Sequence, residues 1–235
     1  MMLLPAIVLA LCAQSNRPRD PWVFRCVLDR HPRMVTLALS DEMWVAYDAT
    51  HCALYKAWKG GVKFDGPVYT TVHGPQPTTR GTSYLEAADG DAWITRAKGA
   101  EVPAKPVWRG YRFNGDHVAL EYAIVLPDGR EIAVQESPEF VLPEQMLDDR
   151  RMKELGFTPG RPGFLRNFLA RELPKDVEIQ VRVRTDSATA KVVGVVGDAR
   201  VVLTQERPSA SLAVFFEPLP DPEPEPKPEP KEEAK

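Results

Sequence analysis

A regular alternation of side chains in the middle of the chain constrains its fold more than any other feature. Large apolar side chains occupy every second position of one stretch: Val118, Leu120, Tyr122, Ile124 and Leu126. Side chains two positions apart lie on one face of a β-strand, whereas a helix brings together side chains three or four positions apart. We therefore predict a strand with one buried face.

The residues that follow this strand predict a hairpin. Pro127-Asp128-Gly129-Arg130 has the composition of a tight turn. The next stretch, Glu131 to Gln135, again places Ile132 and Val134 on one face. Two alternating runs joined by a turn are typical of an antiparallel hairpin with one wet face.

The same period of two recurs in shorter stretches along the chain. They are Val35 to Leu39, Val177 to Arg184, Lys191 to Val196, Arg200 to Thr204 and Leu212 to Phe216. Gly197-Asp198 predicts a turn, and hence a second hairpin, between residues 191–196 and 200–204. Many short strands separated by turn signals indicate an all-β fold, an antiparallel β-sandwich.

Two aromatic runs form another predicted hairpin. Trp44 to Tyr47 and Ala53 to Trp58 are joined by the longer loop 48–52. Tyr55 and Trp58 are three positions apart, so a regular strand would place them on opposite faces. The Gly and Pro residues between Gly60 and Gly81 predict turns and extended chain after this hairpin.

One segment departs from the strand period. Residues 144–155 carry Met and Leu among charged side chains and contain no Gly or Pro. Pro143 precedes the segment and Gly156 follows it, as is typical of the first turn and the C-terminal cap of a helix. We predict one helix here, inserted between strands.

The C-terminal end differs in composition from the rest of the chain. Residues 218–235 alternate Pro with Glu and Lys, and they hold six acidic residues and three lysines. The formal charge of the whole chain is −3, so residues 1–217 are neutral. We predict a β-sandwich domain over residues 16–217 and a disordered tail over residues 218–235. Because no stretch is strongly basic, no nucleic-acid partner is expected.

The N-terminus predicts export. Leu3 to Ala13 is an apolar run of signal-peptide length that is too short to cross a bilayer. Ala13-Gln14-Ser15 offers a small-x-small cleavage site, so residues 1–15 are predicted to be a signal peptide. We expect a periplasmic or extracellular protein without a transmembrane span. Lipid anchoring at Cys12 is the alternative.

Cleavage would leave two cysteines, Cys26 and Cys52. In an oxidising compartment an isolated pair is a disulfide candidate. Two buried thiols that pack as small apolar side chains are the alternative. Neither cysteine belongs to a CxxC or CxxCH motif, so we expect no zinc ribbon, no covalently bound haem and no other cofactor.

His73 is the one histidine that suggests acid–base chemistry. The four histidines have no metal-ligand spacing, and the chain contains no phosphate-binding glycine loop, GxSxG or HExxH motif. Gly74 and nearby prolines shape the loop around His73, and Asp65 is close in sequence. An imidazole and a carboxylate together can transfer protons near neutral pH. A histidine that binds loop backbone groups is the alternative.

The same stretch predicts a sugar-binding surface. Aromatic rings can stack on the apolar face of a sugar while nearby polar side chains bind its hydroxyl groups. The predicted ligand-binding residues are Trp58, Lys59, Asp65, Tyr69, His73 and Gln76, with Trp44 and Tyr47 as further platform aromatics. Packing of these aromatic side chains in the core is the alternative.

Several segments resemble a β-rich part of large exported bacterial multidomain proteins. The segments are DPWVFR (20–25), RMVTLAL (33–39), WVAYD (44–48), ALYKAWKGGV (53–62), YTTVHGPQP (69–77) and RGYR (109–112), and the likeness continues to the strands near Val183. Such proteins often also carry c-type cytochrome domains and dehydrogenase-like or carbohydrate-active modules. The resemblance implies an accessory β-sandwich that binds carbohydrate or docks to a redox or hydrolytic partner, without its own haem.

The expected fold is also similar to that of sugar mutarotases, which use a histidine and a carboxylate. That likeness implies an alternative function, a mutarotase-like or epimerase-like enzyme. His73 would then act with one of three carboxylates, Asp65, Glu121 or Glu136. A purely structural protein-interaction module is the third possibility.

Overall fold

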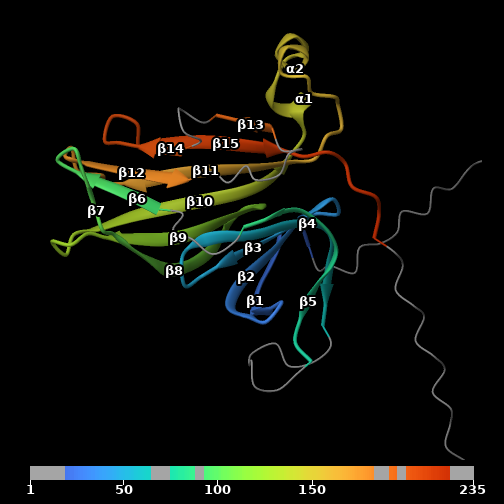
Figure 1. Cartoon of the computed structure of the whole chain (residues 1–235), viewed down its shortest axis with the longest axis horizontal. Helices are drawn as coiled ribbons and strands as arrows, with labels where there is room; N and C mark the ends of the chain where they lie inside the picture. The colour runs from blue at the N-terminus through green and yellow to red at the C-terminus, as the bar shows by residue number, and fades with distance from the viewer. Residues whose placement is uncertain (1–18, 65–74, 88–92, 183–190, 195–199, 223–235) are drawn as a thin grey trace, which may run out of the picture.

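A computed structural model describes residues 19–64, 75–87, 93–182, 191–194 and 200–222. These residues form antiparallel sheets and two short helices (Figure 1). The all-β sandwich that the period of two predicts is confirmed. The predicted signal peptide, and the tail after Pro222, lie outside the described residues.

Sheet A is a five-stranded meander at the N-terminal end of the described chain. Its strands pair in chain order: β1 (Trp22–Leu28), β2 (His31–Ser40), β3 (Met43–Asp48), β4 (Ala53–Lys63) and β5 (Thr78–Glu86). The predicted hairpin of the two aromatic runs is confirmed as β3 and β4.

The register between β3 and β4 skips Tyr55, which forms a β-bulge. The extra residue reverses the alternation of side chains along β4. Tyr55 and Trp58 therefore pack on the same face of sheet A, contrary to the prediction for a regular strand.

Sheet C contains the central hairpin, and all six of its strands come from the part of the chain between β8 and β15. In spatial order the strands are β13 (Lys191–Val193), β15 (Ser209–Phe215), β11 (Gly163–Arg171), β10 (Glu131–Val141), β9 (His117–Val125) and β8 (Lys105–Asn114). The predicted hairpin is confirmed as β9 and β10, and the Leu126 N–H donates to the Arg130 carbonyl across its turn at 2.9 Å.

Sheet B has four strands, and its composition corrects the second predicted hairpin. In spatial order the strands are β14 (Arg200–Leu203), β12 (Val177–Arg182), β6 (Trp93–Ala97) and β7 (Ala100–Val102). The predicted partners β13 and β14 belong to different sheets, because β13 pairs with β15 and β14 pairs with β12. Pairing with distant strands thus overrides the local turn signal.

Two helices replace the single predicted helix. They are α1 (Pro143–Met146) and α2 (Asp149–Leu155). Leu147 is extended and ends α1, and the Asp148 carboxylate accepts a hydrogen bond from the Arg151 N–H at 2.7 Å, which caps α2. Gly156 ends α2 in the left-handed conformation, as predicted. Within the described residues, no helix is long and apolar enough to cross a membrane.

The main core lies between sheet C on one side and sheets A and B on the other. The ring of Trp93 in sheet B lies 5.5 Å from that of Tyr122 and 6.2 Å from that of Phe168, both in sheet C. Tyr47 of sheet A is fully buried in the same core. One continuous apolar core therefore joins the three sheets.

A smaller core lies on the other face of sheet A. We call it the satellite core, and its buried residues are Cys26, Leu28, Met34, Ala38, Trp44, Ala46 and Trp58. An antiparallel sheet usually exposes the face that points away from the main core. Burial of two tryptophans on this face therefore requires a second cover.

Cys26 and Cys52 are free thiols in different cores. Cys26 lies in the satellite core and Cys52 lies in the main core, on the opposite face of sheet A. The structure thus has the two buried thiols of the second alternative and not the disulfide candidate. Burial raises the pKa of Cys26 to about 11 and the pKa of Cys52 to about 12.

Candidate functional site

The cover of the satellite core is the far part of the β4–β5 ribbon. This part, residues 60–64 with 78–81, is called the arm here. Gly60 and Gly81 pair at its base with φ angles of 135° and 104°. A Cβ on Gly60 would lie 2.2 Å from the Arg80 carbonyl oxygen, so only glycine fits at this bend. The bend folds the arm back toward β1.

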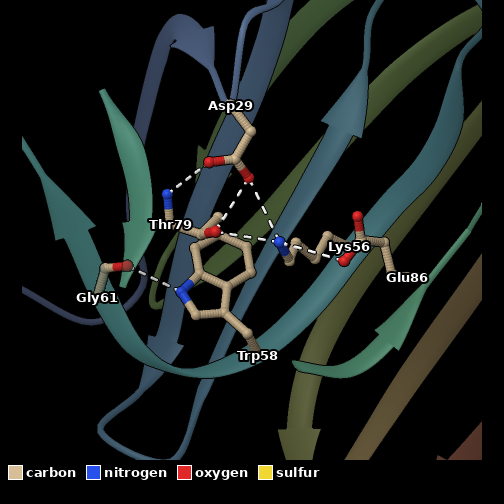
Figure 2. Close-up of polar contacts among 6 residues, drawn as sticks. All are labelled: Asp29, Lys56, Trp58, Gly61, Thr79 and Glu86. Carbon is tan, nitrogen blue, oxygen red and sulfur yellow. Dashed lines mark hydrogen bonds and ion pairs between the residues drawn. The ribbon is translucent and has the colours of Figure 1, made fainter. Parts of the chain in front are cut away.

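Asp29, in the turn between β1 and β2, binds the folded arm (Figure 2). Its Oδ1 accepts the Thr79 N–H at 2.7 Å, and its Oδ2 accepts the Thr79 hydroxyl at 3.0 Å. The Lys56 ammonium lies 3.4 Å from Asp29 Oδ2 and 3.3 Å from Glu86 Oε2. The Asp29 N–H also donates to the Pro77 carbonyl at 3.1 Å. We call the contacts that Asp29 makes with Thr79, Lys56 and Pro77 the latch.

Two tryptophans are stacked beneath the arm. The rings of Trp44 and Trp58 lie 6.0 Å apart with an interplanar angle of 27°. The Trp58 indole N–H donates to the Gly61 carbonyl at 2.8 Å, which ties it to the arm (Figure 2). Trp58 is fully buried, so its ring presents no face to a ligand in this conformation.

Three further aromatic rings lie at the open edge of the satellite core. The ring of Phe24 lies 4.8 Å from that of Trp22 and 5.3 Å from that of Phe64. Trp22 and Phe24 are half-buried, and Phe64 at the end of the arm is 45% exposed. We call Trp22, Phe24 and Phe64 the aromatic rim. The period of two in β1, which places Trp22 and Phe24 on one face, is the sequence signal for it.

The predicted ligand-binding residues do not meet within the described part of the chain. Trp58 packs in the satellite core. Lys59 points to the other side of sheet A, where its ammonium lies 2.9 Å from Glu42 Oε2 and 2.8 Å from Asp221 Oδ1. Gln76 is half-buried just before β5. Asp65, Tyr69 and His73 lie outside the described residues, so their roles stay predictions.

Two of the three carboxylates proposed as partners of His73, Glu121 and Glu136, lie on opposite faces of sheet C, and the third, Asp65, lies outside the described residues. Glu121 is on the outer face, 3.2 Å from the Arg112 guanidinium. Glu136 points into the main core and is fully buried. The two side chains therefore cannot serve one site, and neither geometry supports an acid–base pair.

Glu136 is the centre of a buried polar cluster that joins sheets A and C. Its two oxygens accept the Arg166 Nε–H at 2.6 Å and Nη2–H at 3.1 Å. They also accept the hydroxyl groups of Tyr47 at 2.5 Å and Tyr122 at 3.2 Å. These four bonds occupy the carboxylate, so it has no capacity left for proton transfer to a ligand.

Burial and the ion pair shift the pKa values of the groups that bind Glu136. Burial, followed by the nearby Glu136 carboxylate, raises the pKa of Tyr47 and the pKa of Tyr122 well above their ordinary value. Burial alone would lower the pKa of Arg166, but the Glu136 charge outweighs this and raises it. The cluster thus holds one charge pair and two neutral donors and has a structural role.

Neither the search for a metal site nor the comparison with known proteins points to another candidate site. Within the described residues, no three His, Cys, Asp or Glu side chains are grouped closely enough to hold a metal ion. No protein-family model, no curated protein and no solved structure matches this chain. The aromatic rim, with the latched arm behind it, is therefore the candidate site.

Proposed function

We propose that this chain is an exported accessory β-sandwich module that binds carbohydrate through the aromatic rim. One observation carries the proposal: Trp22, Phe24 and Phe64 form a contiguous, partly exposed aromatic surface, with ring centroids 4.8–6.2 Å apart. A sugar ring can place its apolar C–H face on such a surface and keep its hydroxyl groups in water or on polar side chains.

The position of the rim supports the sugar interpretation. Phe64 directly precedes residues 65–74, which contain three of the predicted ligand-binding residues, Asp65, Tyr69 and His73. Polar side chains that follow an exposed ring in sequence would supply hydrogen-bond partners for sugar hydroxyl groups. A redox or hydrolytic protein partner that docks on the same rings is the other form of an accessory role.

The enzyme alternative has less support. A mutarotase-like mechanism needs a histidine and an unoccupied carboxylate facing one substrate. Glu136 is saturated by Arg166 and two tyrosines, and Glu121 is paired with Arg112 on the far face of sheet C. His73 with Asp65 remains a prediction.

Titration calorimetry of the wild type and two single variants tests the proposal. Cellohexaose, xylohexaose, hexa-N-acetylchitohexaose and mannohexaose serve as neutral probes for the wild type, Trp22→Ala and Phe64→Ala. We expect at least one probe to bind, and each rim variant to weaken that binding about tenfold, as for loss of a stacking aromatic.

Phe113→Ala is the matched control. Phe113 is 41% exposed, close to the value of Phe64, but it lies on β8. It should bind the probes as tightly as the wild type. Absence of binding to all four probes, and to a wider glycan array, would remove the carbohydrate proposal and leave protein docking, which pull-down from a periplasmic extract would test.

A further inference from the structure

We infer that Asp29 is a positioning residue that assembles the aromatic rim by holding the arm closed. The inference rests on the proposed function for its ligand, but the contacts of Asp29 stand independently of it. Trp22 and Phe24 belong to β1, whereas Phe64 is the first residue after β4. The three rings form one surface only when the arm is folded onto β1.

The position of Asp29 in its turn suits this role. Asp29 and Arg30 have φ angles of 50° and 69°, the signature of a two-residue type I′ turn between β1 and β2. This tight turn fixes the carboxylate at the end of the hairpin. From there it reaches both the backbone and the side chain of Thr79 on the arm.

Asp29 makes three hydrogen bonds with the arm and the residue just before it. It accepts two from Thr79, and its N–H donates to the Pro77 carbonyl. The Thr79 hydroxyl also accepts a hydrogen bond from the Lys56 ammonium, and the Gly61 carbonyl accepts the Trp58 indole N–H (Figure 2). Two glycines at the base allow the ribbon to change its bend without side-chain clashes.

Closure of the arm and binding at the rim are then linked equilibria. A ligand that needs all three rings binds only the closed state, so its apparent dissociation constant rises as the closed fraction falls. By the same linkage, the bound ligand protects the arm from opening. Asp29 thus controls affinity without touching the ligand.

Hydrogen–deuterium exchange of the full chain tests the inference without any ligand. Asp29→Ala should speed exchange of residues 61–64 and 78–81 about tenfold or more and leave β9 to β11 unchanged. Asp29→Asn retains an acceptor for the Thr79 N–H, so the exchange rate of its arm should lie between those of Asp29→Ala and the wild type. Glu86→Gln is the control, because Glu86 contacts Lys56 but not the arm; it should exchange like the wild type.

Binding of the hexasaccharide probes provides the second readout. Asp29→Ala should weaken binding of the probe. The Asp29→Cys/Thr79→Cys double variant should bind the probe like the wild type when oxidised and more weakly when reduced. Unchanged exchange of the arm in Asp29→Ala would overturn the inference, whether or not a sugar binds. Faster exchange of the arm in a protein that binds no probe supports the latch and contradicts the proposed function.

Discussion

Two carboxylates in different surroundings each hold separate strands of this protein together. Glu136 lies in the main core, and Asp29 lies over the satellite core. Glu136 is fully buried and accepts bonds from Arg166 and two tyrosines. Asp29 accepts a similar set of bonds from Thr79 and Lys56, but its side chain remains 19% exposed. Water can replace a lost partner at Asp29 and cannot do so at Glu136.

This difference in solvent exposure predicts that the two cores open in different ways. Losing a partner of a buried charge leaves that charge without compensation, which is far more costly than the same loss near solvent. The main core should therefore open only with the whole domain. The satellite core, covered by a narrow ribbon with glycines at its base, should open locally.

The largest predicted effect is in the main core. Arg166→Met leaves Glu136 buried without its cation and should cost roughly 3–5 kcal/mol of unfolding free energy. Urea unfolding followed by far-UV circular dichroism measures the loss. The Arg166→Met/Glu136→Gln double variant removes the stranded charge and should regain much of it. A loss below ~1 kcal/mol in the single variant would contradict rigid burial of the pair.

Alkaline pH should separate the buried thiols from the buried tyrosines. Cys26 and Cys52 have folded-state pKa values of about 11 and about 12. The unfolded value is about 8.5, so stability is fully present below about pH 8.5 and falls as pH rises toward the folded values. Tyr47 and Tyr122 add a second decline above about pH 10, because their pKa values are also raised in the folded chain.

Single variants identify the side chains that cause each phase of this decline in stability. Cys26→Ala and Cys52→Ala should each flatten the fall of the unfolding free energy between about pH 8.5 and 10, and Tyr47→Phe should flatten only the part above about pH 10. The measurement is urea unfolding at a series of pH values. Stability that is constant up to about pH 10 would show that the thiols are not buried as described.

A smaller effect is predicted at the bend of the arm. Gly60→Ala places a methyl group 2.2 Å from the Arg80 carbonyl oxygen at a φ of 135°. It should cost about 1–3 kcal/mol locally and speed exchange in the arm. Gly61→Ala, the adjacent position, meets nothing within 4 Å and should behave like the wild type. Equal stability and equal exchange rates in the two variants would argue against a requirement for glycine at position 60.

The alternation of side chains predicts where the strands of this fold lie in the sequence better than it predicts which strands pair. β9 and β10 follow from it because only five residues, 126–130, connect them. The partners of β13 and β14 do not follow, because each belongs to a different sheet and neither strand pairs with its neighbour in the sequence. The spacing of Met and Leu over residues 144–155 predicts one continuous helix, whereas the Asp148 side chain caps a second helix in the middle of this segment.

The candidate site was predicted only in outline. The aromatic stretch marks the right part of the chain, but the bend at Gly60 turns Trp58 into a core residue and leaves Phe64 exposed. Glu136 carries a readable signal, since it follows Ile132 and Val134 on the inward face of β10. Its partner Arg166, 30 residues later, depends on the pairing of β10 with β11 and has no local signature.

Thiol labelling tests the independence of the two cores most directly, because each core contains one buried cysteine. Iodoacetamide modification at pH 8.5 under native conditions, read per site by peptide mass spectrometry, reports how often each thiol becomes accessible. We expect Cys26 to react about tenfold or more faster than Cys52, and Asp29→Ala to speed Cys26 alone. Equal rates at the two cysteines, or equal acceleration of both by Asp29→Ala, would contradict local opening of the satellite core.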